Sequence, residues 1–257
     1  MPNDSLMDLT PIEARRLGFA LQAHALTMSG DVTRPVLCSI VLEFTETGYT
    51  LTSTDSHILL HTSHGLETPA AMTAIGEAVL LSSNSAKPST VFRDVGKALA
   101  AAALADGDVS FRFQERDGDA GEYGALTKCG LLAISGGGVY VPPIRLGDPA
   151  TFPQWRTLWP DLSNVDADTS RAVNLLPRLV GVLSKVHNLA QKAAALDGNS
   201  SVMVLEPGLK ETGPIPFYFS QEVAGWHWHG IVMPTKIQAG LINGYRHHLT
   251  PEAVRNV

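Results

Sequence analysis

The stretch VTRPVLCSIVLEFTETGYTLTSTDSHILL, residues 32–60, decides the fold class. It contains two runs rich in β-branched and aromatic residues, PVLCSIVLEF (35–44) and YTLTSTD (49–55). A short Thr-Glu-Thr-Gly segment separates them, which predicts a hairpin, and HILLHTS (57–63) continues the sheet. An amphipathic helical pattern precedes the hairpin, so the sequence predicts an α+β fold.

Helical patterns recur three times along the chain. The first opens with Thr10, Pro11 and Glu13, which predict a capping box, and covers 11–29; the others cover 88–104 and 174–196. Each is followed by about three strand-like runs. After the second come 109–116, 124–130 and 131–142, and after the third come 201–207, 216–221 and 226–234. The sequence therefore predicts an array of similar half-domains, each a helix plus antiparallel strands.

Composition narrows the class of protein. The chain has 257 residues, a formal net charge of -6 and two cysteines, Cys38 and Cys129, whose spacing matches no redox or metal motif. We expect both cysteines to be reduced and structural. The first residues lack the pattern of a secretory leader, and no apolar run is long enough to span a bilayer, so we expect a cytoplasmic protein without membrane contact. The acidic total argues against a surface that is basic throughout, but it permits one basic face.

Three segments, in the same order, resemble the bacterial DNA polymerase III β sliding clamp family. The hairpin ending in Thr54-Asp55-Ser56-His57-Ile58-Leu59 resembles the family's Thr-Asp-Gly-His-Arg-Leu, and FPQWRTLWP (152–160) resembles Phe-Pro-Asp-Tyr-Arg. VMPTKI (232–237) resembles the terminal Val-Met-Pro-Met-Arg-Leu. The chain departs from the family at 56, 58 and 235, and it holds the equivalent of the middle domain plus only the second half of the last. The compact size suits a viral, bacteriophage-like or mobile-element clamp.

The resemblance implies an apolar groove that takes short peptides of polymerase and clamp-loader proteins. A concave site with a flexible methionine, and a proline that halts strand pairing, suits a peptide with Leu or Phe anchors. The alternative is that His57 and Met233 are ordinary core or rim residues and that Pro234 simply ends a strand. The expected groove consists of Thr54, Ser56, His57, Ile58 and Leu59, facing Val232, Met233, Pro234, Thr235 and Ile237.

A second expected surface is a basic one that faces duplex DNA. Arg178, Lys185 and Lys192 are spaced by seven residues, which places them on one helix face, and no carboxylate occurs from 175 to 196. Weak, sequence-independent phosphate contacts would allow sliding. The alternative is an ordinary solvated helix face. The remaining expected DNA-facing residues are Arg15, Arg16, Arg34, Lys87, Arg93 and Lys97.

No catalytic constellation is evident, so we expect no enzymatic activity and no cofactor. ISGGGV (134–139) lacks the Lys-Ser/Thr of a phosphate-binding loop. His227 and His229 share one face of a strand, but no further ligands follow at a zinc spacing, so no metal site is assigned. The alternative from another functional class is a small enzyme that uses this histidine-rich strand to bind a metal.

The leading hypothesis is a homo-oligomeric processivity clamp that encircles duplex DNA and tethers a replicative polymerase. The alternative is a clamp-like decoy or adaptor that binds the same peptides without encircling DNA. Family rings contain twelve half-units, so three per chain imply four subunits, although an odd number disturbs the pairing of halves. The alternative is that the missing half is present in a form that the sequence does not reveal, which gives a two-domain chain suited to a trimer. We expect a clamp domain over 1–150, a linker over 151–173, a reduced clamp-like domain over 174–237 and an extension over 238–257. In that extension, Gln238, Leu241 and Ile242 loosely resemble a clamp-binding peptide.

Overall fold

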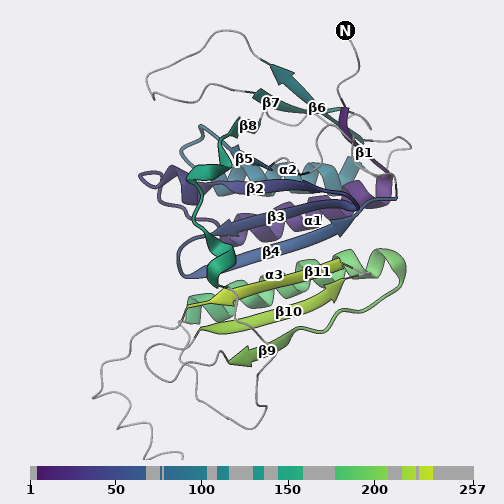
Figure 1. Cartoon of the computed structure of the whole chain (residues 1–257). Coiled ribbons are helices and arrows are strands. Elements are labelled where there is room, and N and C mark those ends of the chain that lie inside the picture. Colours follow the sequence, from purple (N-terminus) through teal and green to yellow (C-terminus); the bar gives the residue numbers. More distant parts are fainter. Residues whose placement is uncertain are drawn as a thin grey trace, which may run out of the picture.

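The structure of the chain is a computed structural model (Figure 1). The described part of the chain comprises residues 5–67, 76, 78–102, 109–115, 130–135, 144–158, 177–207, 216–223 and 226–233.

The first two units share one order of elements: a leading strand, a helix and three further strands. The first unit consists of β1 (Ser5–Leu9), α1 (Pro11–Thr27), β2 (Ile40–Thr45), β3 (Gly48–Thr54) and β4 (Ile58–Gly65). The second consists of β5 (Ala78–Ser82), α2 (Pro88–Ala102), β6 (Val109–Glu115), β7 (Gly130–Ser135) and β8 (Ile144–Gly147). Thr10 caps α1 in the predicted capping box, because its side chain accepts from the Glu13 N–H while the Glu13 carboxylate accepts from the Thr10 N–H.

The third unit has a helix and three strands in its described residues. It consists of α3 (Pro177–Ala194), β9 (Val204–Pro207), β10 (Phe217–Val223) and β11 (Trp226–Val232). Short 3-10 helices lie at Pro35–Cys38, Pro149–Thr151, Trp155–Leu158 and Ala195–Asp197. The last of these ends at Gly198, whose φ of 71° is the left-handed conformation that favours glycine after a helix.

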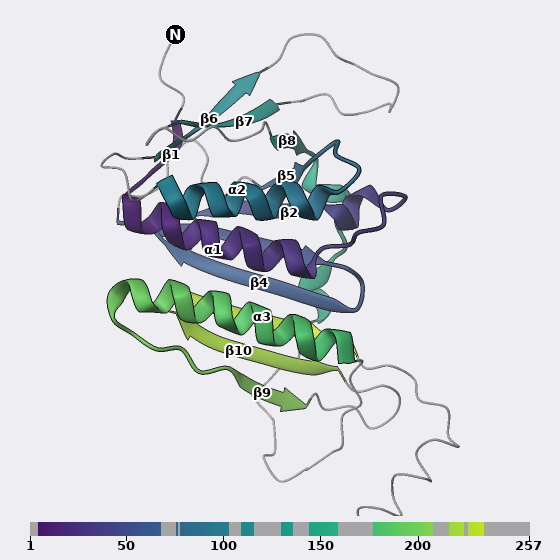
Figure 2. The same cartoon turned by 180° about the vertical axis from the view of Figure 1, so that it is seen from behind.

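The strands of the described residues form one antiparallel sheet of eleven, in the order β1-β6-β7-β8-β5-β2-β3-β4-β11-β10-β9. Leading strands are exchanged between the first two units, since β5 pairs with β2 and β1 pairs with β6. The three helices lie side by side on one face of this sheet, in the order α2, α1, α3 (Figure 2). Residues at alternate positions along each strand therefore face either the helices or the opposite face, which we call the outer face. None of the described helices is long and apolar enough to cross a membrane.

The helices α1 and α2 cross at two glycines. A Cβ on Gly18 would lie 2.6 Å from the Gly96 carbonyl oxygen, and a Cβ on Gly96 would lie 2.5 Å from the Gly18 carbonyl oxygen. Real Cβ atoms do not come so close, so only glycine permits this separation of the two backbones. The reciprocal contacts show that the two units are packed in equivalent ways.

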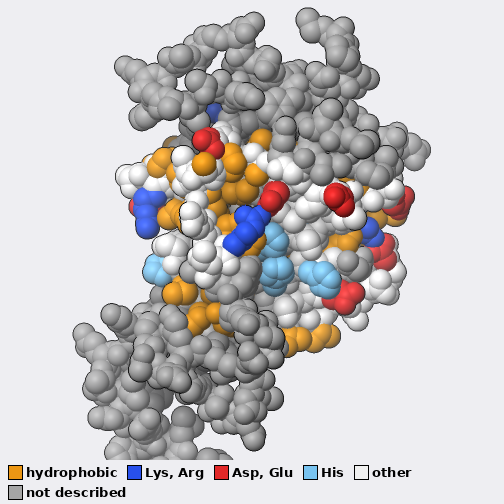
Figure 3. All heavy atoms as spheres, in the orientation of Figure 1, with side chains coloured by type: hydrophobic (Ala, Val, Ile, Leu, Met, Phe, Trp, Pro, Cys, Tyr) orange, Lys and Arg blue, Asp and Glu red, His pale blue; other side chains and the backbone are white. Residues whose placement is uncertain are grey.

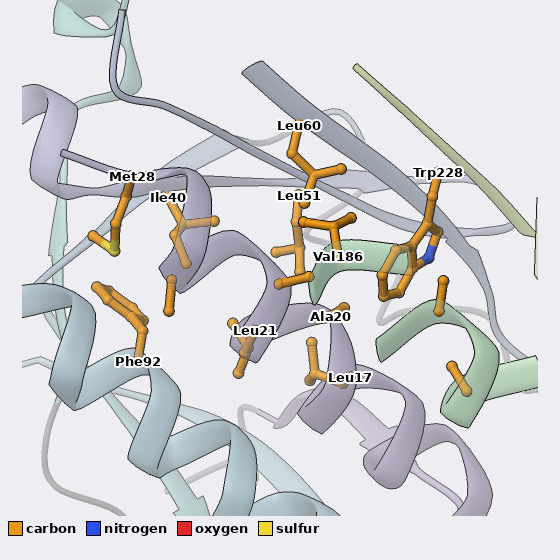
Figure 4. Close-up of a cluster of buried hydrophobic side chains, with 14 of the residues drawn as sticks. Leu17, Ala20, Leu21, Met28, Ile40, Leu51, Leu60, Phe92, Val186 and Trp228 are labelled. Atoms are coloured by element: carbon orange, nitrogen blue, oxygen red, sulfur yellow. The ribbon is translucent and has the colours of Figure 1, made fainter. Parts of the chain in front are cut away.

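The main core lies between the helices and the sheet (Figure 4). Leu17 and Leu21 of α1 and Phe92 of α2 point into it, and Trp228 of β11 packs beside Val186 of α3 (Figure 4). Full burial of each such side chain contributes about 1.5–3 kcal/mol relative to exposure. The same cluster extends from α2 to α3, so the third unit shares one core with the first two.

A buried polar network joins α1 to the hairpin. His24 lies 2.8 Å from the Ser53 hydroxyl and 3.0 Å from the Thr62 hydroxyl, and Thr62 lies 2.7 Å from His64. Burial, together with the other histidines, holds the pKa of His24 well below its usual range. Burial likewise lowers the pKa of His64 to about 3. These imidazoles are neutral hydrogen-bonding groups at neutral pH.

The structure confirms the α+β class and the three helices, and it corrects several boundaries. The predicted strand 35–44 begins only at Ile40, because Pro35 starts a 3-10 turn. Strand β1 was not predicted, and neither was β8, which lies between the predicted strand 131–142 and the predicted linker 151–173. The first two units therefore begin with a strand, not with a helix. Part of the predicted strand 124–130 and the tail after 233 lie outside the described residues.

Candidate functional surfaces

Two distant segments of the chain meet where the first unit joins the third. Strands β4 and β11 pair in register, with Ile58 opposite Val232 and His61 opposite His229. One residue beyond the ladder, the Met233 N–H donates to the His57 carbonyl oxygen at 2.7 Å. The structure thus brings together the two segments from which the sequence predicted a groove.

The turn before β4 is fixed by its own side chains. One Asp55 carboxylate oxygen accepts from the backbone N–H groups of His57 and Ile58, each at 2.8 Å. The other oxygen lies 3.1 Å from the Arg178 guanidinium, which ties the turn to the start of α3. Ser56 has a φ of 75°, in the left-handed region that favours glycine, so the turn holds a serine in a strained conformation.

Neighbouring residues at this junction point to opposite faces of the sheet. Ile58 and Val232 are fully buried in the core beneath the helices. Leu59 and Ile231 belong to a separate apolar cluster on the outer face. Because side chains alternate along a strand, Ile58 and Val232 support the junction from inside and cannot contact a ligand on the outer face.

A strap, residues 148–158, covers part of the outer apolar cluster (Figure 1). The Asp148 carboxylate accepts from the Ala150 N–H and opens a 3-10 turn, after which the side chains of Phe152 and Trp155 are buried against the sheet. The Arg156 guanidinium lies over the Trp155 ring at 4.6 Å and pairs with Glu43 of β2. The cluster consists of Val41, Leu59, Leu80, Phe152, Trp155, Tyr218 and Ile231, with Val36 and Ala78 packed against it.

Histidines adjoin the strap on the outer face (Figure 3). The His61 ring lies 4.5 Å from the Trp155 ring and 4.8 Å from the His229 ring, and its Nδ1 is 2.8 Å from the Thr52 hydroxyl. Burial lowers the pKa of His61 to about 3 and that of His229 to about 4. Among the described residues, no three His, Cys, Asp or Glu side chains are close enough to hold a metal ion.

The predicted groove residues fall into three groups. Met233 is 39% exposed, and Ser56 and His57 are exposed beside it. Thr54 is buried, and its hydroxyl donates to the Ile58 carbonyl at 2.8 Å, while Leu59 lies in the outer cluster. Pro234, Thr235 and Ile237 lie outside the described residues. The strap residues Phe152 and Trp155 belong to the same outer face. The groove prediction omitted them, although their segment, 152–160, is one of the three that resemble the clamp family.

The other surface is the exposed side of the helix layer. Five basic side chains are exposed there, and the one exposed acidic residue on the described parts of α1, α2 and α3 is Asp94, which lies 3.6 Å from Arg93 and 3.7 Å from Lys97. The buried flank of α3 holds Leu179, Leu183 and Val186, so its basic residues lie on the solvent side. The five are Arg93, Lys97, Arg178, Lys185 and Lys192.

The remaining predicted DNA-facing residues differ in their surroundings. Arg16 pairs with Asp197, and its guanidinium lies 4.5 Å from the Trp226 ring centroid, so it links α1 to the third unit. Arg15 is half-buried on the same helix. Arg34 and Lys87 are exposed on loops that flank helices. Within the described part of the chain, Lys185 and Lys192 form no salt bridge, which leaves both ammonium groups available to a ligand.

The architecture is that of a row of helix-and-strand units whose helices share one face and whose sheet is continuous. The chain is similar in structure to DNA polymerase sliding clamps from Bacillus subtilis (13% identity, TM-score 0.47) and to a DNA polymerase III β chain from Streptococcus pneumoniae (14%, 0.47). A third match is a putative DNA polymerase III β subunit from Eubacterium rectale (10%, 0.41).

The Bacillus subtilis match covers 90% of this chain and 64% of that clamp, and the Streptococcus pneumoniae match covers 92% and 66%. The Eubacterium rectale match covers 90% of this chain and 51% of that protein. The chain therefore spans from about half to two thirds of the length of these proteins. No protein-family model and no curated protein matches the sequence.

Proposed function

We propose that this chain is a subunit of a DNA sliding clamp, which encircles duplex DNA and tethers a polymerase through peptides bound on its outer face. The observation that carries the proposal is the separation of two surfaces by one sheet. A layer of helices with exposed basic side chains covers one face, and an apolar cluster with an exposed methionine lies on the other.

The helix surface suits a phosphate backbone. Five exposed basic groups against one carboxylate give a net positive surface on a chain of net charge -6. Lys and Arg contacts to phosphates carry no sequence information and weaken with salt, so they permit movement along the duplex. Lys185 and Lys192 would make the main contribution, because Asp94 partly neutralises the α2 pair.

The outer surface suits a short extended peptide with apolar anchors. Met233 adapts its shape to different apolar groups, and the exposed His57 lies directly across the ladder from it. Behind them, Leu59 and Ile231 continue the apolar surface toward the strap. Two or three anchors, each contributing about 1.5–3 kcal/mol on burial, are enough for a transient tether.

The DNA part is tested by comparing retention on nicked circular DNA with retention on the same DNA after linearisation. An encircling protein stays with the circle and leaves the open ends, and Lys185→Glu with Lys192→Glu should reduce retention on the circle at least tenfold. Arg145→Glu is the matched control, since Arg145 is an exposed charge on the outer side of β8. Equal retention of the circular and linear forms by the parent chain would refute encirclement.

The peptide part is tested with a synthetic peptide of the Gln-x-x-Leu-Phe type. Met233→Lys should weaken its binding at least tenfold, because a charged group replaces the exposed apolar one. Val32→Lys is the control: Val32 is an exposed apolar residue (52%) on the loop before β2. Equal weakening by both variants would show that the peptide does not bind at the β4–β11 junction.

A clamp-like adaptor is the second candidate, and one observation favours it. Both sides of the outer junction, His57 and Met233, belong to a single chain, so peptide binding there needs no closed ring. Sedimentation velocity separates the two functions. A chain that binds the peptide as a monomer and shows no preference for circular DNA would be an adaptor.

A further inference from the structure

The strap, residues 148–158, folds on itself and is attached to the sheet through side chains. The N–H groups of Phe152 and Trp155 donate to carbonyl oxygens of the strap's own prolines, at 2.9 Å and 2.7 Å. The side chains of the same two residues are buried in the outer apolar cluster. The Arg156 guanidinium pairs with the Glu43 carboxylate of β2, which forms a latch beside them. The strap thus meets the sheet at two aromatic anchors and one ion pair.

This arrangement is that of a short peptide docked on an apolar surface. The anchors Phe152 and Trp155 are three residues apart, and the residues between them, Pro153 and Gln154, are exposed. The Trp155 ring lies 4.5 Å from the His61 ring of β4. Buried anchors at a fixed spacing in an otherwise exposed segment are the usual way in which short peptides bind proteins. A segment held in this way, without a backbone ladder to support it, belongs to the part of a fold that opens first.

The surface beneath the anchors is apolar and continuous across all three units. The strap crosses it from the side of β5 toward β4 (Figure 1). A sheet surface of this kind, if uncovered, would be an apolar patch of the type that marks a protein–protein contact. Its sheet residues come from five strands, β2, β4, β5, β10 and β11, and they are Val41, Leu59, Leu80, Tyr218 and Ile231.

We propose that this surface is a second docking site for a partner protein, that the strap occupies it in the free chain, and that a partner segment takes the strap's place. The strap itself defines the chemistry of that segment: an aromatic residue, a second aromatic residue three positions later, and an arginine directly after it. The arginine would pair with Glu43. The site is distinct from the junction beside Met233, because Trp155 contacts His61, which is four residues along the chain from His57.

The strap competes with a partner segment because it is tethered to the site. A tethered segment has an effective concentration of about 1 mM. For a free peptide that binds the uncovered surface with a Kd of about 0.1 mM, the strap therefore weakens the observed binding about tenfold. A partner overcomes this competition with a tighter segment or with a further contact elsewhere on the chain. The strap thus sets a threshold that excludes weak apolar peptides.

The test is the binding of a fluorescent peptide with the sequence of residues 148–158 to the full chain, followed by anisotropy. Phe152→Ala with Trp155→Ala removes the strap's own anchors, so this variant should bind the peptide at least tenfold more tightly than the parent chain. Gln154→Ala is the control, since it changes an exposed strap residue and keeps both anchors. A peptide with alanine at both anchor positions should bind none of these chains. A double variant that binds the peptide no better than the parent would overturn the proposal.

Charge exchange at the latch gives a second readout that keeps both anchors in place. Arg156→Glu sets two carboxylates side by side, which repels the strap and leaves Glu43 to the arginine of the peptide, so peptide affinity should rise at least threefold. Adding Glu43→Arg restores an attractive pair within the chain and repels the peptide's arginine, so the affinity should return to the parent level or below.

Both latch residues are at the surface, with side chains 61% (Arg156) and 31% (Glu43) exposed, so these variants should fold. Equal peptide affinities of the single and double latch variants would overturn the exchange. Met233→Lys lies outside this site and should leave binding of the strap peptide unchanged, so the result is independent of the peptide site in the proposed function.

Discussion

Gly230 of β11 sets the spacing at the junction between the first and third units. A Cβ at this position would lie well under 3.0 Å from both the Leu59 carbonyl oxygen and the Phe219 ring. Gly230→Ala therefore requires β11 to move away from β4 by about 1 Å and the Phe219 ring to tilt out of its buried site. Ladder hydrogen bonds of about 1 kcal/mol each would stretch, and overpacking costs about 1–3 kcal/mol. We expect a total loss of about 2–4 kcal/mol.

The assay is urea unfolding of the parent chain and the variant, with stability compared at a common denaturant concentration. Gly65→Ala is the matched control, because Gly65 is the last residue of β4 and a Cβ there would meet the Trp226 side chain at an ordinary 3.9 Å. It should change stability by less than about 0.5 kcal/mol. A Gly230→Ala variant as stable as the control would refute the close approach of β11 to β4 and, with it, the geometry of the outer junction.

Three further changes test other parts of the structure. Ser56→Gly should stabilise the chain by about 1 kcal/mol in the same urea assay, since Ser56 has a φ of 75°; a loss of stability would show that the Ser56 side chain contributes more than its strain costs. His61 and His64 have pKa values of about 3, below the ordinary value of 6.5, so the unfolded chain binds more protons. Their contribution to the free energy of unfolding should therefore be fully present above about pH 6.5, and the free energy of unfolding should fall by about 2 kcal/mol per histidine between pH 8 and pH 5. Equal unfolding midpoints at the two pH values would contradict the burial of these histidines in the neutral form. Arg16→Met should lower the melting temperature by removing the contacts with Asp197 and Trp226; an unchanged melting temperature would show that this link between units contributes nothing.

Much of the fold was predictable because local patterns and tertiary structure agree. The capping box at Thr10 and Glu13 starts α1 where the sequence placed it, and the strand predicted at 216–221 coincides with most of β10. The errors arose where a local pattern is ambiguous. Five residues at 5–9 are too few to show a strand by periodicity, and the four residues of β8 lie between prolines, which are typical of a loop.

The outer surface was predictable only in part, because two residues that are adjacent in the sequence can lie on opposite faces of the sheet. Ile58 and Leu59 are neighbours in the sequence, yet one lies in the main core and the other in the outer cluster. The register of β4 on β11 decides this, and a register between strands about 170 residues apart cannot be read from either strand alone. The strap residues Phe152 and Trp155 show the same limit, since their burial depends on crossing strands distant in sequence.

One contact links the two proposed surfaces, and its strength decides whether they act independently. Arg178 belongs to the basic helix face, but its guanidinium pairs at 3.1 Å with Asp55, the residue that shapes the turn beside Met233. A phosphate that draws Arg178 away would leave the two backbone bonds to Asp55 intact. The Arg178 side chain is 53% exposed, and pairs of this kind contribute only about 0–1 kcal/mol. Coupling between DNA and peptide through this pair is therefore at most about fivefold. The sheet thus separates the two surfaces energetically as well as spatially, and charge reversals on the helix face should leave peptide affinity nearly unchanged.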